Sequence, residues 1–330
     1  MRELTFEQRI EAQKRSSKTR SVLSRYSTVF LFFGPYLFFF TLFFLYPLIR
    51  GFIDSFFFWN FGDSVSDMRF VGWQNYQNIL FENPDFPLAH QWFTTGLGHT
   101  VLFVALTVPF LIVIPLIIAL LLNKKPWGES FFRALFFLPN VLSVATVCLI
   151  FRYVFNSSMG LVRNFPYQSD VTSAWVVLVL TTLWWTVGNN MVILNAGLKQ
   201  VDKSLYEAAS VDGCNQFKQV FYITLPQIGN QILICTITTI IASFNVYGQS
   251  ALITNGGPLD ATMMFIQRVL QFKNNPSAGT GGAGVANAMC ILFSLIIVVI
   301  SIIQLLLSKD RSKTTRKKRE IKKKTKERGI

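Results

Sequence analysis

The sequence predicts an all-α integral membrane protein with six transmembrane helices, and three observations lead to this fold class. Hydrophobic residues make up 51% of the 330 residues, and the mean hydropathy is positive at +0.41. Charged residues contribute only 15%, whereas soluble domains carry about a quarter. The apolar residues also gather in blocks of about 20, the length with which a helix crosses roughly 30 Å of hydrocarbon.

Six apolar blocks with few internal charges are long enough to be membrane spans. Any one of them could be a buried helix in a soluble protein, but six together favour a membrane domain. We expect the first block to stay as a helix, because it starts late and lacks the small-residue cleavage site of a signal peptide. The expected spans are residues 28–48, 98–122, 131–155, 174–194, 228–247 and 284–307.

Basic residues set the expected orientation of these spans, because loops rich in Lys and Arg remain on the cytoplasmic side. They gather in the segment 1–27, after the second span, before the fifth span and in the tail 308–330. We therefore expect both termini of the membrane domain 28–307 to lie in the cytoplasm. The tail accounts for most of the net charge of +14. Contact with anionic lipid headgroups explains it better than nucleic-acid binding, since no aromatic residues interleave the basic ones.

The sequence offers no catalytic constellation and no metal site. The four cysteines have neither metal-ligand nor disulfide spacing, histidine occurs only twice, and no HExxH or GxSxG motif is present. The glycine cluster at residues 279–284 lacks the Lys and Ser/Thr of a phosphate-binding loop, so we do not expect this chain to hydrolyse ATP itself. An ion-driven transporter usually holds a charged side chain within a span, and here only Arg152, near the end of one block, comes close.

One polar stretch, EAASVDGCNQFKQVFYITLP, separates the fourth span from the fifth. Its pattern predicts two short amphipathic helices, with Gly213 giving the freedom to turn between them and Pro226 marking the bend into the fifth span. Such a pair facing the cytoplasm is suited to docking a partner. The same pattern would also serve a connector that packs on its own membrane domain.

This stretch resembles the signature of the membrane subunits, or permeases, of ATP-binding-cassette (ABC) importers. That signature runs EAA, three residues, Gly, nine residues, Ile, one residue and Leu-Pro, and every spacing is satisfied here. A departure is Val201-Asp202, where the family usually has Ile-Pro. The matching residues are Glu207, Ala208, Ala209, Gly213, Ile223, Leu225 and Pro226.

Other segments resemble the permeases of the maltose type, so that the resemblance covers nearly the whole chain. Gly284, Ala286 and Ala288 match the small residues at the start of the family's last span. The matching segments are GPYLFFFTLFFLYPL from Gly34, FVGWQNY from Phe70, FFLPNVLS from Phe136 and ALITNGGP up to Pro258.

The resemblance implies the type I ABC importer permease architecture in a bacterial cell membrane. It implies that the loop 199–226 carries a coupling helix seated on a separate ATPase subunit. The expected partners are two ATPase subunits, a second, different permease and an extracellular solute-binding protein. ATP and Mg²⁺ would be bound by the ATPases, and no cofactor is expected on this chain. The implied roles are a polar contact for Glu207, close packing for Ala208 and Ala209, a hinge for Gly213, and a joint to the fifth span for Leu225-Pro226.

The substrate path is expected where polar and aromatic residues interrupt the spans, because such residues cost free energy unless they face a cavity. Trp offers a face for stacking on a sugar, and Asn, Thr and Ser can hydrogen-bond to hydroxyl groups. The alternative is that these residues bond one helix to the next. The candidate path residues are Trp185, Thr186, Asn189, Thr239, Ser243 and Asn140.

Together these features favour the permease of a sugar or oligosaccharide importer, which is not an enzyme by itself. Permeases for amino acids, phosphate or polyamines share the EAA loop, so a non-sugar solute is the main alternative. A secondary transporter or an integral-membrane enzyme is a weaker one. We expect residues 51–96, with Trp59, Trp73 and Tyr76, and the TNGGP segment to meet the solute-binding protein.

Overall fold

The computed structural model describes residues 30–327, apart from residues 61, 63, 65, 66, 85, 157–159 and 275–281. Side chains are described as far as residue 306, with those of residues 273 and 274 also excepted. The predicted N-terminal segment 1–27 and the side chains of the predicted basic tail therefore lie outside the described residues. Within that part of the chain, helices dominate, and two short strands form one antiparallel hairpin.

Long helices alternate with short connecting elements along the chain. The first half contains the π-helical turn η1 (Thr41–Leu45), α2 (Tyr46–Asp54), β1 (Phe57–Phe58), β2 (Arg69–Phe70), α3 (Gln74–Leu80), α4 (Pro87–Asn123), α5 (Glu129–Val141) and α6 (Val144–Val154). The second half contains α7 (Val171–Leu198), α8 (Lys203–Val211), α9 (Gln216–Gln219), η3 (Val220–Thr224), α10 (Leu225–Gln227), α11 (Gly229–Phe244), η4 (Ser250–Thr254), α12 (Phe265–Asn274) and α13 (Gly282–Glu327). In the hairpin, Phe57 pairs with Phe70 and Phe58 with Arg69.

Among the described residues, four helices are long and apolar enough to cross a membrane, and two bent helix pairs bring the number to six if each pair is one span. The four helices correspond to the first, second, fourth and sixth predicted spans. The second begins earlier than predicted, at Pro87, because the first helical turn is where the missing N–H of proline costs least. The four are Phe30–Asp54, Pro87–Asn123, Val171–Leu198 and Gly282–Leu306.

The third predicted span, residues 131–155, is not one continuous helix. It consists of α5 and α6, which are bent by 99° relative to each other. Leu142 and Ser143 adopt extended backbone between them, and the Ser143 hydroxyl accepts the N–H of Thr146 at the start of α6. Pro139 removes a donor from the last turn of α5, so the helix ends readily there. The prediction of an unbroken span is therefore wrong at this point.

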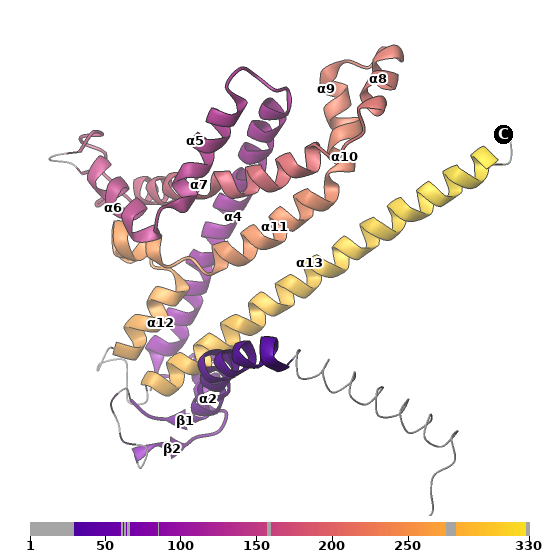
Figure 1. Ribbon diagram of the computed structural model, residues 1–330. Coiled ribbons are helices and arrows are strands. Elements are labelled where there is room, and N and C mark those ends of the chain that lie inside the picture. The colour runs from indigo at the N-terminus through magenta and orange to yellow at the C-terminus, as the bar shows by residue number, and fades with distance from the viewer. Residues whose placement is uncertain are drawn as a thin grey trace, which may run out of the picture.

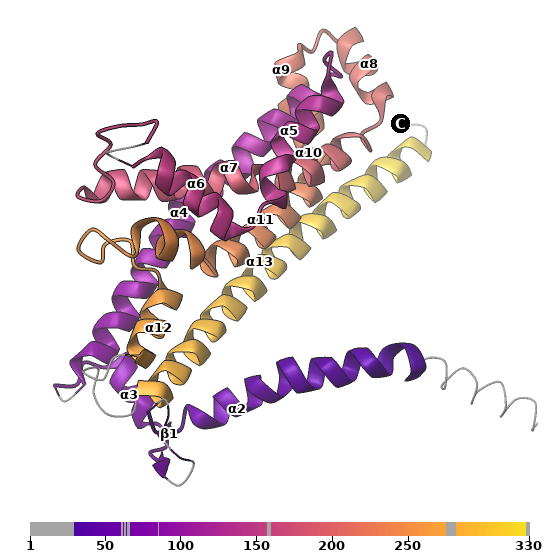
Figure 2. The same cartoon turned by 60° about the vertical axis from the view of Figure 1, so that its left-hand side comes forward.

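The helices form a bundle with two distinct ends. α4 packs against α7, α11 and α12, and α5 crosses α7 (Figure 1). α8 and α9 project beyond one end of the bundle, whereas the β-hairpin, α3 and α12 gather toward the other end (Figures 1 and 2). The first span leans away from the bundle (Figure 2), and no residue of its apolar window is buried. Its surface is thus suited to contact with lipid or with another membrane helix.

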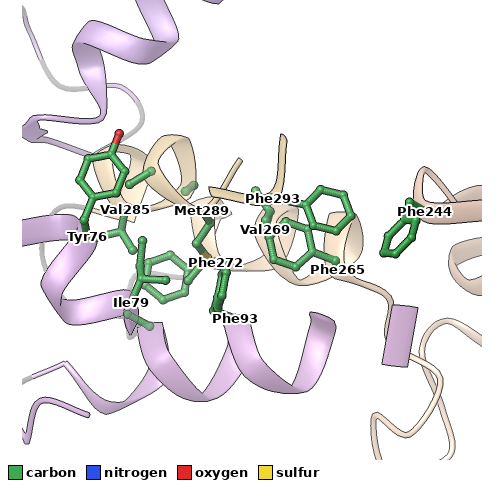
Figure 3. Packing of buried hydrophobic residues seen from close by; sticks show 13 residues of the cluster. Tyr76, Ile79, Phe93, Phe244, Phe265, Val269, Phe272, Val285, Met289 and Phe293 are labelled. Atoms are coloured by element: carbon green, nitrogen blue, oxygen red, sulfur yellow. The ribbon is translucent and has the colours of Figure 1, made fainter. Parts of the chain in front are cut away.

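One hydrophobic core fills the end of the bundle that holds the hairpin (Figure 3). The ring of Phe265 in α12 stacks on that of Phe293 in α13, with centroids 4.0 Å apart. Phe93 of α4 meets the ring of Phe265 edge-on at 5.5 Å. Aromatic pairs of this kind add stabilisation beyond the burial of their area. The core therefore fixes α4, α12 and α13 to one another although they are far apart in the sequence.

Candidate functional site

The two short helices predicted between the fourth and fifth spans are present, and we call residues 203–227 the arm. Glu207 and Ala208 are exposed on α8, and Ala209 is half-buried. Asp202 caps α8 by accepting the N–H of Ser204 at 3.0 Å. The residue that departs from the family's Ile-Pro pattern therefore has a local role, which is to start the helix.

Gly213 makes the turn between the two helices of the arm. Its φ is +75°, a left-handed conformation that residues with a Cβ rarely adopt. A Cβ built on Gly213 would meet nothing within 4 Å, so the backbone conformation, and not the lack of space, requires glycine. Asn215 then begins α9 by accepting the N–H of Lys218 at 2.9 Å.

Hydrogen bonds join α8 to the second half of the arm. The hydroxyls of Tyr206 and Thr224 lie 2.9 Å apart. The Gln219 amide donates to the Ser210 hydroxyl at 3.0 Å, which joins the second helix back to α8. Both bonds close the turn at Gly213 and join α8 to the segment that leads into α11.

Contacts with Lys124 and with the cluster around Ile228 connect the arm to the bundle. Lys124, directly after α4, donates to the Gln216 side chain at 3.2 Å. Leu225 packs against the buried cluster that includes Ile228, where the chain bends by 69° into α11. The predicted bend thus lies two residues beyond Pro226, which is itself exposed, and Ile223 is half-buried.

A cavity of about 160 Å³ lies within the bundle between α4, α5, α7 and α11, and we call it the inner cavity. All six residues predicted for the substrate path line it. They come from the end of α5, from the middle of α7 and from the second half of α11. These residues are Asn140, Trp185, Thr186, Asn189, Thr239 and Ser243.

Other residues also line the inner cavity; the sequence marks Thr182, Asn190 and Thr238 among them as polar residues within spans, but the six candidates do not include them. Asn190 and Gln249 are the most informative, because an amide in an apolar segment is as strong a sign of a cavity as the neighbouring Asn189. The apolar members carry no sign in the sequence, since they resemble any other residue of a span. The residues outside the candidate set are Phe103, Leu111, Thr182, Asn190, Thr238, Ala242, Val246 and Gln249.

The lining of the inner cavity is mostly apolar, and its polar groups are uncharged, since none of the residues that line it is Asp, Glu, Lys, Arg or His. The Thr182 and Thr186 hydroxyls donate to carbonyls of their own helix, which leaves their oxygen lone pairs as acceptors. Asn189 is exposed within α7, so its amide adds both donors and an acceptor. Such a lining suits a neutral ligand with hydroxyl groups, since an ion there would lose hydration without gaining a counter-charge.

Trp185 has a structural contact that its sequence position did not indicate. Its indole N–H donates to the carbonyl of Leu142 at 3.1 Å, across the break between α5 and α6. Leu142 has extended backbone, so its carbonyl lies outside the helical bonding pattern. The ring of Trp185 therefore lines the inner cavity while its N–H holds the broken span in place.

At the end of the bundle opposite the arm, only one of three predicted contact residues is freely exposed. Trp73 is 66% exposed, but Tyr76 is 6% exposed and its hydroxyl lies 2.6 Å from that of Ser55. Asn75 likewise donates to the backbone carbonyls of Ser55 and Phe57, and Trp59 is half-buried. The expectation that Tyr76 meets a partner protein is therefore wrong, since the FVGWQNY segment uses it to anchor α3.

The TNGGP segment forms a compact turn at the same end. Asn255 and Gly256 have φ of +52° and +84°, a conformation that Asn and Gly adopt most easily. The Thr262 hydroxyl donates to the carbonyl of Gly257 at 2.7 Å and lies 2.8 Å from the Thr254 hydroxyl.

Within the described residues, no three His, Cys, Asp or Glu side chains are grouped so as to hold a metal ion.

Comparison with known families gives one match that covers most of the chain. Residues 86–313 match the family described as "Binding-protein-dependent transport system inner membrane component". The matched region begins just before α4 and therefore contains the arm and the inner cavity.

Two similar relatives are transport permeases by name. The multiple sugar-binding transport system permease protein MsmF of Streptococcus mutans is 29% identical over 277 residues, covering 81% of this chain and 90% of the relative. The arabinooligosaccharides transport system permease protein AraP of Halalkalibacterium halodurans is 29% identical over 293 residues, covering 84% and 87%.

A solved structure has the same fold. It is a chain of a bacterial ABC transporter involved in the import of the acidic polysaccharide alginate. The TM-score is 0.73 at 16% sequence identity, with 88% of this chain and 98% of that chain covered. At this identity the likeness concerns the fold alone.

Proposed function

This chain belongs to the family of binding-protein-dependent transport system inner membrane components, and on that premise we propose that it is the permease of an ATP-driven importer of sugars or oligosaccharides. It is a multi-pass membrane protein of the type I importer permease fold. The observation that carries the proposal is the inner cavity, which brings Asn140, Trp185, Asn189 and Ser243 together between the spans.

The chemistry of the inner cavity supports a carbohydrate as the substrate. Amides and hydroxyls match the hydroxyl groups of a sugar in both donors and acceptors. The ring of Trp185 offers an apolar face of the kind that stacks on a sugar ring. The names of the relatives MsmF and AraP, which refer to sugars and arabinooligosaccharides, point in the same direction.

The arm supports coupling to a separate ATPase subunit. α8 projects beyond the end of the bundle (Figure 1), and Glu207 and Ala208 are exposed on it. Hydrogen bonds join α8 to the rest of the arm. In our proposal the ATPase pair binds ATP and Mg²⁺ and moves α8, and the joint from Leu225 to Ile228 passes that movement to α11. α11 carries Thr239 and Ser243, so the movement reaches the inner cavity directly.

The proposed assembly contains two ATPase subunits, a second permease and an extracellular solute-binding protein. The arm and both termini face the cytoplasm, and the end with the hairpin and the TNGGP segment faces outward to the binding protein. The chain itself is non-catalytic, since hydrolysis takes place on the partner ATPases. The bundle closes only one side of the substrate path, and the second permease closes the other.

Affinity purification of the chain from its native membrane, followed by mass spectrometry, tests this proposal. We expect a second permease with an EAA loop and an ATPase with a phosphate-binding loop to copurify. The purified assembly, placed in proteoliposomes with a co-encoded binding protein, should then import at least one neutral oligosaccharide when ATP is supplied. Purification of the chain alone, or uptake driven by an ion gradient without ATP, would contradict it.

A further inference from the structure

A second cavity, of about 690 Å³, lies at the end of the bundle opposite the arm, and we call it the outer cavity. We propose that it is a carbohydrate-binding site where a neutral oligosaccharide is received before it reaches the inner cavity. This inference rests on the proposed function, which assigns that end to the outside. The lining of the outer cavity includes Trp92, Tyr247, Asn255, Asp260, Arg268 and Gln271.

The outer cavity is built around one buried cation. The side chain of Arg268 is only 8% exposed, and it donates to the carboxylate of Asp260 at 3.1 Å. Its guanidinium carbon also lies 5.3 Å from the ring centre of Trp92, a favourable cation–π distance. The Nε of Arg268 has no hydrogen-bond partner among the described atoms, so the guanidinium has more donors than partners. Arg268 is thus held rigidly from two sides.

This arrangement presents a fixed acceptor to a ligand. The carboxylate of Asp260 is 56% exposed, and within the described residues only the hydrogen bond from Arg268 uses its lone pairs. A carboxylate has about four lone-pair positions, so most of them remain for the hydroxyl groups of a sugar. The ion pair with Arg268 holds the carboxylate in one orientation, which reduces the entropy lost when a ligand binds.

Other side chains add hydrogen-bonding amides and an aromatic ring to the outer cavity. Asn255 and Gln271 are exposed and line the outer cavity with amides, each of which offers two donors and one acceptor. Tyr247 is 41% exposed, so its ring is available for stacking on the apolar face of a sugar. Carboxylate, amides and an aromatic ring together match a neutral polyol better than an anion, because Asp260 would repel a second carboxylate.

The position of the outer cavity places it next to the inner one. Val246 and Gln249 line the inner cavity, whereas Tyr247 and Ala251 line the outer cavity. One short segment between α11 and the TNGGP turn therefore separates the two. A movement of α11 driven through the arm would also shift this segment. In our proposal that shift opens the path from the outer cavity, where the sugar is bound, to the inner cavity.

The test measures equilibrium binding of neutral oligosaccharides to the complete importer in lipid nanodiscs, without ATP and without binding protein. The probes are maltotriose, arabinotriose, raffinose and lactose, and binding is followed by saturation-transfer NMR and calorimetry. The double variant Asp260→Asn/Gln271→Ala alters exposed side chains only. Leu259→Asn is the matched control, because Leu259 lies beside Asp260, is 97% exposed and does not line the outer cavity.

We expect the double variant to weaken binding of the recognised probe at least tenfold and the control to change it less than twofold. The inference is overturned if the wild-type importer takes up a probe but binds none without its binding protein, or if the double variant binds as the wild type does. It is also overturned if the double variant weakens docking of the binding protein but not binding of the sugar, since the outer cavity would then be a protein contact. If no neutral sugar is bound or taken up, the proposed function itself is contradicted.

Discussion

Asn190 of α7 donates its amide to the backbone carbonyl of Leu111 in α4 at 2.8 Å, inside the bundle where both residues are buried. In a helix this carbonyl would accept from the N–H four residues later, and that residue is Pro115, which has no N–H. The side chain of Asn190 therefore supplies the donor that the proline removes. The same amide donates to the Thr239 hydroxyl of α11 at 2.8 Å, so one side chain joins three helices around the inner cavity.

Asn190→Ala should destabilise the bundle, because it leaves the carbonyl of Leu111 and the hydroxyl of Thr239 buried without their partner. A buried polar group without a hydrogen bond costs about 1–3 kcal/mol. We expect a clear drop in the thermal unfolding temperature of the detergent-solubilised protein. The neighbouring Asn189→Ala is the control, since Asn189 is exposed and should leave the unfolding temperature almost unchanged. Equal effects of the two variants would contradict this role for Asn190.

Gly188→Ala should prevent α5 and α7 from packing as they do. A Cβ on Gly188 would lie 2.5 Å from the carbonyl oxygen of Phe136 and 2.7 Å from the Cα of Phe137. These are backbone atoms, which cannot move away as the end of a flexible side chain can. Overpacking of this kind costs about 1–3 kcal/mol. We expect a lower unfolding temperature and less folded protein by size-exclusion chromatography. Gly98→Ala in α4, where nothing lies within 4 Å, should behave as the wild type.

Gly213→Val should uncouple ATP hydrolysis from uptake while leaving membrane insertion intact. Valine at φ near +75° is strained by about 1–2 kcal/mol, so the turn between α8 and α9 would reorient the arm. The measurement compares ATPase activity with sugar uptake in proteoliposomes. Gly213→Asn should retain most coupling, because Asn tolerates the left-handed conformation. Normal uptake in the valine variant would refute the hinge role of Gly213.

Trp185→Phe and Trp185→Ala should have different effects, because the ring of Trp185 lines the inner cavity whereas its N–H bonds to the carbonyl of Leu142. The Phe variant keeps an aromatic face for the substrate but loses the hydrogen bond to Leu142, so its unfolding temperature should fall while the uptake KM changes little. The Ala variant also loses the ring, and its uptake KM should rise about tenfold. Unchanged transport kinetics in the Ala variant would remove Trp185 from the substrate site.

Much of this protein could be predicted from local patterns. Apolar block length located the spans, since a helix has to match the hydrocarbon thickness whatever its neighbours are. The spacing of Gly213 and Pro226 predicted the two helices of the arm and the bend after them, because turn and helix-break chemistry depends on a few adjacent residues. Polar and aromatic residues within the fourth and fifth spans, such as Asn189 and Ser243, indicated the inner cavity. Polar residues cost free energy in lipid, so within a span they indicate a cavity.

Other features depend on residues that the sequence keeps far apart. The break at Leu142 is stabilised by Trp185, and the proline in α4 is compensated by Asn190, so neither could be read from its own helix. Tyr76 lies in an aromatic segment typical of a contact surface, yet the fold buries it against Ser55.

The outer cavity was the least predictable feature, because it needs Trp92, Asp260 and Arg268 from three different elements. Local sequence determined which segments are helical and which residues are too polar for lipid. The tertiary structure alone decided which of those residues meet, because a hydrogen bond or an ion pair depends on distances that only the packing of the helices sets.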